Sequence, residues 1–225
     1  MANRDEVAAI IRRSDEVLRT AYAGLEMMKS PSGLTQNIGL RNVLTFGRSV
    51  TFVLQNLNGK HDRYEEWYQP KQERMKSSKL FSFFRDARNN LEKQGKLDIS
   101  TSVHGMAFTS EKMSAFEAER PPGATSFFFG DSLGGSGWIV KLPNGEDLHY
   151  YVQVPESIAK VEQYFSGALA EKYFGASSDS TLELAKIYLG ELSEIVDDAS
   201  KFFLNEEPAQ MHNGKRLPPH LRIAK

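Results

Sequence analysis

The sequence predicts an α+β fold with an N-terminal helical bundle, a small antiparallel sheet and two C-terminal helices. Three observations lead to this fold class. Apolar residues recur at three- and four-residue steps through most of residues 4–94, which is typical of amphipathic helices. After Gly95 the chain changes to short β-rich runs around an Asn-Gly pair. Helical periodicity then returns in residues 155–204.

Length and composition are those of a globular chain able to bury a core. The 225 residues are 40% hydrophobic and 25% charged. The absence of cysteine excludes a disulfide scaffold, a cysteine-ligated metal and a thiol nucleophile. We expect a helical bundle in residues 1–96, a sheet with two helices in 97–205 packed on it as one unit, and a tail in 206–225.

Two helices should open the bundle. The first covers residues 4–29, where apolar side chains alternate with charged ones at helical spacing. Ser30, Pro31, Ser32 and Gly33 then interrupt the pattern. The second covers about residues 35–57, and Gly59 can adopt the left-handed conformation that ends a helix.

Two more helices should complete it. Residues 62–76 form the third segment, in which Pro70 should break or kink the helix. Ser77 or Ser78 then caps a fourth helix that reaches Gln94 and is closed by Gly95.

The following region should be mainly β-structure. Residues 97–108 alternate loosely, as in a strand, and residues 137–142 and 147–154 are β-rich runs on either side of Asn144-Gly145. An Asn-Gly pair in this position favours a type I′ hairpin, because that turn needs two positive φ angles.

Helices should return after the hairpin. Pro155 suits a first helical turn, so we expect one helix over residues 155–174 and a last one from about residue 178 to Leu204. Residues 206–225 should be extended, or ordered only by docking onto the rest of the protein.

Charge is unevenly distributed along the chain. The formal net charge is only -1, which excludes a uniformly basic nucleic-acid coat. Residues 41–96, however, contain twelve basic and six acidic side chains, a net charge of +6, whereas residues 97–225 have a net charge of -7. The second to fourth helices therefore form a basic block in an otherwise acidic chain.

Several familiar sites are missing from the sequence. The glycine-rich residues 130–137 lead into a strand-like run and lack the lysine of a phosphate loop. The histidines do not have metal-ligand spacing, and a Gly-x-Ser-x-Gly elbow is absent. We therefore expect neither a metal nor a cofactor.

The basic block contains the main candidate site. Arg41 and Arg48 lie on the second predicted helix, and Arg85, Arg88 and Lys93 lie on the fourth. If these helices are antiparallel neighbours, their guanidinium groups gather at one end of the bundle, where they would suit a phosphate-bearing ligand such as RNA or a nucleotide. The alternative is that Arg88 pairs with a carboxylate one turn away and that the block is a solvated helix face.

The end of the fourth helix also resembles a known family. A helical bundle with Arg88-Asn89 near the end of its last long helix resembles the HEPN domains, many of which are bacterial ribonucleases or partners of nucleotidyltransferases. The resemblance covers roughly residues 5–95, and the chain as a whole resembles uncharacterised bacterial proteins. The family motif places a histidine four to six residues after the arginine, whereas this chain has Lys93 and then Gln94 and Gly95.

The resemblance implies how such a site would act. The family arginine stabilises the phosphate, and the histidine moves a proton near the 2′-hydroxyl. Lysine, with an ordinary pKa near 10.4, is a poor base at neutral pH, so the resemblance implies binding more readily than cleavage. Cleavage would need a lysine with a strongly lowered pKa at position 93, or a remote histidine such as His104. The catalytic candidates are thus Arg88, Asn89, Lys93 and His104.

Three functions follow as alternatives. The first is a non-catalytic interaction or regulatory module whose basic face binds RNA, a nucleotide or a protein partner. The second is a metal-independent endoribonuclease of a toxin or phage-defence type, and the third is a structural, oligomer-forming protein. HEPN-like bundles commonly dimerise, and the aromatic residues Tyr64, Trp67 and Tyr68 would serve as an interface or as core. The chain lacks an apolar leader and any long apolar run, so we expect a cytoplasmic protein without a membrane partner.

Overall fold

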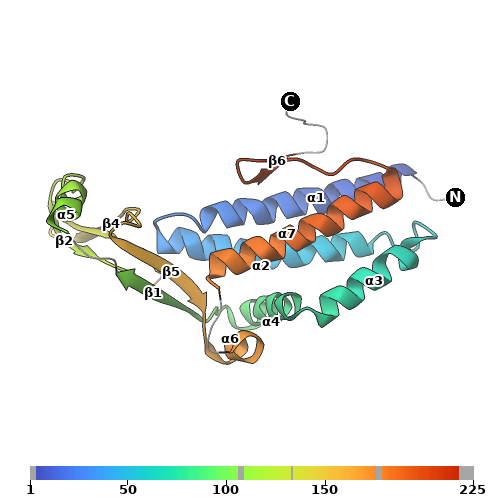
Figure 1. Ribbon diagram of the computed structural model, residues 1–225, viewed down its shortest axis with the longest axis horizontal. Coiled ribbons are helices and arrows are strands. Elements are labelled where there is room, and N and C mark those ends of the chain that lie inside the picture. The colour runs from blue at the N-terminus through green and yellow to red at the C-terminus, as the bar shows by residue number, and fades with distance from the viewer. Residues whose placement is uncertain (1–3, 106–108, 133, 176–178, 218–225) are drawn as a thin grey trace.

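The chain folds into an elongated helical body with a β lobe at one end, as shown in Figure 1. The computed structural model describes residues 4–105, 109–132, 134–175 and 179–217. Three long helices lie side by side, and two shorter ones pack beneath them: α1 (Arg4–Met27), α2 (Gly33–Gln55) and α7 (Thr181–Ala199), with α3 (Tyr64–Ser77) and α4 (Lys79–Gln94). The three predicted parts of the α+β fold are present: the N-terminal helices, the small antiparallel sheets and the C-terminal helices.

Local signals fix the ends of α2 and α4. Ser32 caps α2 by accepting a hydrogen bond from the backbone N–H of Thr35 at 3.4 Å. Ser78 caps α4 in the same way, accepting from the N–H of Phe81 at 3.3 Å. Gly95 ends α4 with a φ of 67°, in the left-handed region that favours glycine. The predicted fourth helix is therefore confirmed together with its caps.

Pro70 was expected to break or kink the third helix, and it does not break it. It lies inside α3, which runs without interruption from Tyr64 to Ser77. Pro70 and Glu66, the residue four positions earlier, are both exposed. The carbonyl that loses its helical partner therefore lies on the solvent side, where water can replace the missing N–H.

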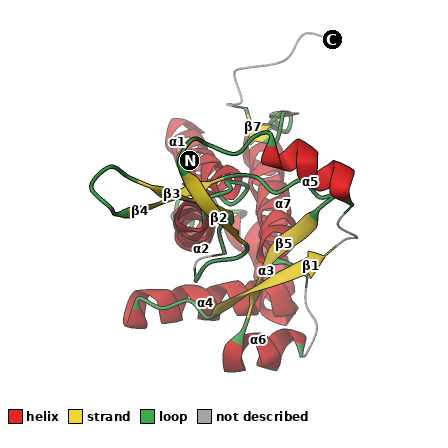
Figure 2. Ribbon diagram, turned by 90° about the vertical axis from the view of Figure 1, so that its left-hand side faces the viewer, coloured by secondary structure: helices red, strands yellow, loops and turns green. Residues whose placement is uncertain are grey.

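The β lobe consists of two small antiparallel sheets. β1 (Ile99–Gly105) pairs with β5 (Ala159–Phe165), and β2 (Ala124–Phe128), β3 (Gly137–Lys141) and β4 (Asp147–Tyr151) pair in that order. The short helix α5 (Ser110–Glu117) lies beside them at the outer end of the lobe (Figures 1 and 2). Phe116 of α5 stacks on Trp138 with a centroid distance of 5.6 Å, and both are buried in a core separate from that of the helices.

The predicted hairpin is confirmed, but its turn is not of type I′. The N–H of Gly145 donates to the carbonyl of Leu142 at 2.9 Å, so Pro143 and Asn144 are the central residues. Pro143 has a fixed negative φ that suits the first central position of a common turn, and only Gly145, with a φ of 86°, is left-handed. A second Asn-Gly pair has the expected geometry, because Asn213 and Gly214 have φ angles of 48° and 75°.

The expected helix over residues 155–174 was wrong in its first half. The N–H of Ile158 donates to the carbonyl of Pro155 at 2.8 Å, which closes a turn. The chain then forms β5, whose residues Ala159, Gln163 and Phe165 are buried, and only α6 (Gly167–Phe174) is helical. Pairing with β1 stabilises this segment as a strand, although proline followed by apolar residues suggests a helix.

The last helix extends beyond its regular part. α7 is followed directly by η1 (Ser200–Leu204), a π-helical turn that ends at Asn205 with a φ of 58°. The predicted end of the final helix at Leu204 is therefore confirmed. None of the described helices has a stretch apolar and long enough to cross a bilayer.

Helices α1 and α2 touch through their backbones. Gly24 of α1 faces Gly39 of α2, and a Cβ atom built on Gly24 would lie 2.7 Å from the Gly39 carbonyl oxygen. A Cβ atom on Gly39 would collide with the Gly24 carbonyl oxygen and lie 2.8 Å from the backbone nitrogen of Met28. Both positions therefore require glycine because the two helix backbones approach closely, and not because glycine can adopt unusual φ angles.

The aromatic residues of α3 belong to the core, which was one of the two alternatives expected for them. Tyr64, Trp67 and Tyr68 are only 4%, 2% and 5% exposed. The indole N–H of Trp67 donates to the carboxylate of Asp198 at 2.7 Å, which ties α3 to α7. Side chains buried this deeply cannot contact a second copy.

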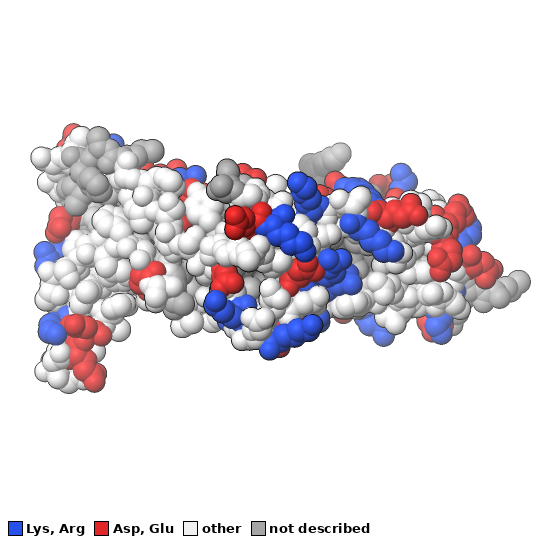
Figure 3. Space-filling view, turned by 90° about the horizontal axis from the view of Figure 1, so that it is seen from below, with Lys and Arg blue, Asp and Glu red and all other residues white. Residues whose placement is uncertain are grey.

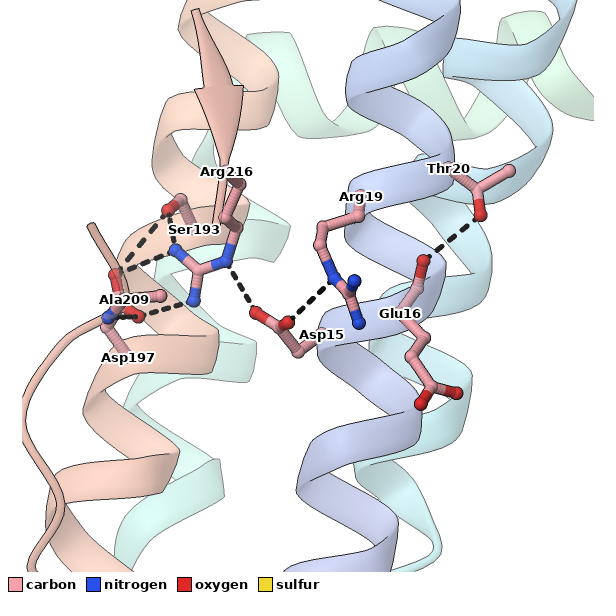
Figure 4. A network of polar contacts seen from close by, with 8 residues as sticks. All are labelled: Asp15, Glu16, Arg19, Thr20, Ser193, Asp197, Ala209 and Arg216. Atoms are coloured by element: carbon pink, nitrogen blue, oxygen red, sulfur yellow. Dashed lines mark hydrogen bonds and ion pairs between the residues drawn. The ribbon is translucent and has the colours of Figure 1, made fainter. Parts of the chain in front are cut away.

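Residues 206–217 of the tail are ordered by docking, one of the two expected alternatives, and residues 218–225 lie outside the described part of the chain. The strands β6 (Met211–His212) and β7 (Lys215–Arg216) form a hairpin that places Arg216 between α1 and α7 (Figure 4). The Arg216 Nε donates to Asp15 at 2.6 Å, and its Nη1 donates to Ser193 at 2.6 Å and to Asp197 at 3.0 Å. The side chains of Arg216 and Asp15 are both 2% exposed, so this ion pair is sealed from water.

Candidate functional site

Helices α2 and α4 are antiparallel neighbours, as the phosphate-site hypothesis required. Arg41 near the start of α2 donates from Nη2 to the carbonyl of Gly95 at the end of α4, at 2.9 Å. Arg48, further along α2, and Arg85 of α4 line the same cavity, and the guanidinium groups of Arg48 and Arg88 lie 4.3 Å and 6.0 Å from the ring centre of Phe52. The arginines of α2 and α4 are thus distributed along the length of the two helices and do not gather at one end of the bundle.

Acidic residues, some from the basic block itself and some from other parts of the chain, pair with much of the basic block. Lys and Arg side chains gather near the middle of the face formed by α3 and α4, with Asp and Glu side chains among and beside them (Figure 3). Seven of the twelve basic residues make an ion pair: Lys60 with Glu6, Arg63 with Glu66, Lys71 with Asp198, Arg74 with Glu191 and Glu194, Arg85 with Asp86, Arg88 with Glu92, and Lys96 with Asp98. The surface is therefore less basic than the sequence segment alone.

A cavity of about 150 Å³ lies where α2, α3, α4 and α7 meet. Its cationic lining residues are Arg48 from α2, Lys76 from α3 and Arg85 from α4. Carboxylates are absent from its described lining, which otherwise consists of polar and apolar side chains: Thr51, Gln55, Tyr68, Gln72, Met75, Phe81, Ser82 and Tyr188. Because three cationic side chains and no carboxylate line the described part of this cavity, it is suited to binding an anion.

Two buried tyrosines, Tyr68 and Tyr188, line this cavity. Tyr188 is 2% exposed, its ring stacks on Phe84 at 4.1 Å, and among the described residues its hydroxyl lacks a hydrogen-bond partner. Burial raises the pKa of Tyr188, so this hydroxyl keeps its proton at neutral pH. The hydroxyl of Tyr68 accepts a hydrogen bond from Gln55 at 2.8 Å, which leaves its own proton available for a ligand.

Arg85 is held at the rim of the cavity by groups behind it. Its Nε donates to Asp86 at 2.8 Å, and Asp86 also accepts from the hydroxyl of Tyr173 at 2.6 Å. Burial alone would raise the pKa of Asp86, but the hydrogen bonds from Arg85 and Tyr173 outweigh it and lower the pKa. Asp86 therefore stays ionised and fixes the position of the guanidinium.

Arg41 is separate from this cavity. It lies seven positions before Arg48 on α2, a distance of about 10 Å along the helix axis. Its hydrogen bond to Gly95 satisfies a carbonyl at the end of α4 that lacks a helical partner. Arg41 therefore has a structural role that the sequence did not indicate.

The four catalytic candidates do not converge. Arg88 pairs with Glu92 at 2.5 Å and contacts Asn89 at 3.4 Å, as expected from helical spacing, while Lys93 is exposed on the next turn. His104 is exposed near the far end of β1, where its ring contacts the hydroxyl of Ser102 at 3.2 Å. It lies five residues beyond Ile99, about 17 Å along a strand that leads away from α4 (Figure 1).

Lys76, Tyr68 and Tyr188 are the site residues that sequence reasoning missed. Lys76 comes directly before Ser77 and Ser78, the predicted capping residues of α4. This position in the sequence would have indicated that Lys76 lies near the start of α4. Tyr188 follows Arg85 by more than a hundred residues, and its approach depends on Gly47 of α2, where a Cβ atom would lie 3.3 Å from the hydroxyl oxygen. Such a contact has no local signal in the sequence.

The comparison with known proteins supplies a family. No curated protein and no solved structure matches the chain. Residues 2–125 match the family described as bacteriophage lambda protein ea47. The match includes α1 to α4, β1 and α5, and with them Arg48, Lys76 and Arg85, whereas Tyr188 lies outside it. Since it spans more than half of the sequence, the chain belongs to the bacteriophage lambda ea47 family.

Proposed function

We propose that this ea47-family protein is a non-catalytic binding module that recognises the phosphate of an RNA or a nucleotide in the cavity between α2, α3, α4 and α7. The observation that carries the proposal is the convergence of Arg48, Lys76 and Arg85 on a space whose described lining contains no carboxylate. Guanidinium forks and an ammonium group are the side chains that bind phosphate oxygens most strongly in proteins. The HEPN-like character of the bundle remains part of this proposal.

The geometry favours binding over cleavage. A ribonuclease without a metal needs a general base within hydrogen-bond reach of the reacting hydroxyl. Arg88 is engaged with Glu92, Lys93 is exposed, and His104 lies in the β lobe. The endoribonuclease alternative would therefore require a rearrangement that brings a base to Arg88.

Loss of a cavity cation should weaken RNA binding more than loss of a cation elsewhere in the basic block. We expect Arg48→Ala and Arg85→Ala each to reduce affinity for a 5′-phosphorylated RNA oligonucleotide at least tenfold, because each removes a charged hydrogen-bond donor from the phosphate. Filter binding at low and moderate salt measures this effect, and wild-type affinity should fall as salt rises.

Arg63→Ala is the matched control, because it removes the same charge from an exposed side chain that already pairs with Glu66. Its affinity should stay within about twofold of wild type, since exposed ion pairs contribute little. Equal losses in all three variants would indicate a general charge effect and contradict a specific cavity. RNA cleavage that disappears in Arg88→Ala would instead establish the nuclease alternative.

A further inference from the structure

The cations left without a carboxylate partner identify the kind of phosphate that fits. In the described part of the chain, five basic residues of the block make no ion pair: Arg41, Arg48, Lys76, Lys79 and Lys93. Two of these, Arg48 and Lys76, line the cavity. Their polar contacts are neutral, since Arg48 donates to Thr51 at 2.9 Å and Lys76 to Gln72 at 3.0 Å. The cavity therefore concentrates about two unpaired positive charges in one place.

The protein surface around the cavity does not offer a continuous row of unpaired cations to a nucleic-acid strand. A nucleic-acid strand presents one negative charge per phosphate, so proteins that follow it need unpaired cations at successive positions. On this face the neighbouring cations Lys71, Arg74 and Arg88 each pair with a carboxylate. A polymer would have to displace several ion pairs, whereas a single phosphate group at the cavity would displace none of these.

The donors also match a terminal phosphate better than an internal one. A phosphomonoester carries a charge of about -1.5 to -2 at neutral pH and has three strongly accepting oxygens. Besides the cations, Tyr68 and Tyr188 line the cavity, and neither hydroxyl donates a hydrogen bond to a described residue. The cavity, of about 150 Å³, is large enough to admit a phosphate group.

The start of α4 adds to this preference. Phe81 and Ser82, from the first turn of the helix, line the cavity, and this turn contains no acidic residue. The positive end of the helix dipole therefore lies beside the cations without a carboxylate to offset it.

We infer that the cavity binds a terminal phosphomonoester, as in a nucleoside monophosphate or at the 5′-phosphate end of an RNA, and not the internal phosphodiesters of a strand. This inference rests on the proposed function, that the cavity binds phosphate. It predicts that a small ligand suffices and that a strand binds only by its phosphorylated end.

Calorimetric titration of the full chain with matched ligands tests the inference. AMP should bind at least tenfold more tightly than 3′,5′-cyclic AMP, in which the phosphate is a diester with one charge. A short RNA with a 5′-phosphate should likewise bind at least tenfold more tightly than the same RNA with a 5′-hydroxyl. Binding of AMP without binding of the phosphorylated RNA also supports the inference and identifies a small molecule as the source.

Two variants connect the effect to the cavity. Tyr188→Phe keeps the stacked ring but removes the unpartnered hydroxyl, so AMP affinity should fall about tenfold. Lys76→Gln removes a cation that lines the cavity and should reduce AMP affinity by more than Tyr188→Phe does. Tyr64→Phe is the control, because Tyr64 is equally buried but does not line the cavity. Unchanged AMP affinity in both Tyr188→Phe and Lys76→Gln would overturn the inference.

The failures of the inference and of the proposed function are distinguishable. Equal binding of the two RNAs, lost in Arg85→Ala, would overturn the preference for a terminal phosphate and leave phosphate recognition at the cavity intact. No binding of AMP or of either RNA by the wild-type protein would overturn both.

Discussion

Gly39→Ala should destabilise the protein by about 3 kcal/mol or more, although alanine is the better helix former. The reason is the backbone contact between α1 and α2, where a Cβ atom on Gly39 would collide with the Gly24 carbonyl oxygen. Both obstructing groups, this carbonyl and the Met28 nitrogen, belong to the backbone and cannot rotate away. The helices must separate, which loosens the apolar layer that includes Leu40 and Val43. Urea denaturation followed by circular dichroism measures the change.

Gly190→Ala provides the matched control with the opposite sign. Gly190 lies inside α7, and nothing lies within 4 Å of the position its Cβ atom would take. The same substitution should therefore stabilise the protein by about 0.5–1 kcal/mol through the lower entropy of the unfolded chain. A loss of less than about 1 kcal/mol in Gly39→Ala would contradict the close packing of α1 on α2.

Arg216→Ala should reduce the free energy of unfolding by about 3–5 kcal/mol, which is typical when one partner of a buried ion pair is removed. The substitution leaves the Asp15 carboxylate, only 2% exposed, with Arg19 as its remaining ion-pair partner. It also removes the ion pair of Asp197 with the tail, so that only the hydrogen bond from the N–H of Ala209 is left there in the described part of the tail. The β6–β7 hairpin should then detach from α1 and α7. Urea denaturation gives the free energy, and limited proteolysis within residues 205–217 reports the detachment.

A double-mutant cycle separates the unpaired charge from the lost packing. Asp15→Asn in the Arg216→Ala background removes the buried charge and should recover part of the stability. Lys215→Ala, at the exposed neighbouring position of the same strand, should change the stability by less than about 0.5 kcal/mol. If Arg216→Ala were as mild as Lys215→Ala, the tail would not be held by its ion pairs.

The fold was predictable where local rules decide the structure. The boundaries of α4 followed from Ser78 and Gly95, because a cap and a left-handed terminus are properties of single residues. The segment around β5 was misassigned because its partner, β1, lies some sixty residues earlier in the sequence and its pairing outweighs a helical start at Pro155. The Gly24–Gly39 contact was also missed, since a glycine inside a helix does not reveal what approaches it.

The candidate site was predictable only in part. The antiparallel arrangement of α2 and α4 brings Arg48 and Arg85 to one cavity, as the basic block suggested. The same block overstated the charge of the surface, because carboxylates from α1 and α7 pair with its residues. Tyr188 could not be assigned from the sequence, because its position depends on how α7 packs against the N-terminal helices.

The docking of the tail also has a consequence for protein synthesis. Asp15 and Arg216 are 201 positions apart, so at 5–20 residues per second a ribosome adds the arginine about 10–40 s after the aspartate. Until then the nascent chain cannot complete the ion pair between α1 and α7, and its N-terminal helices are less stable than in the finished protein. Premature termination before Arg216 would therefore release a polypeptide with an incompletely paired buried carboxylate, a substrate for cellular proteases.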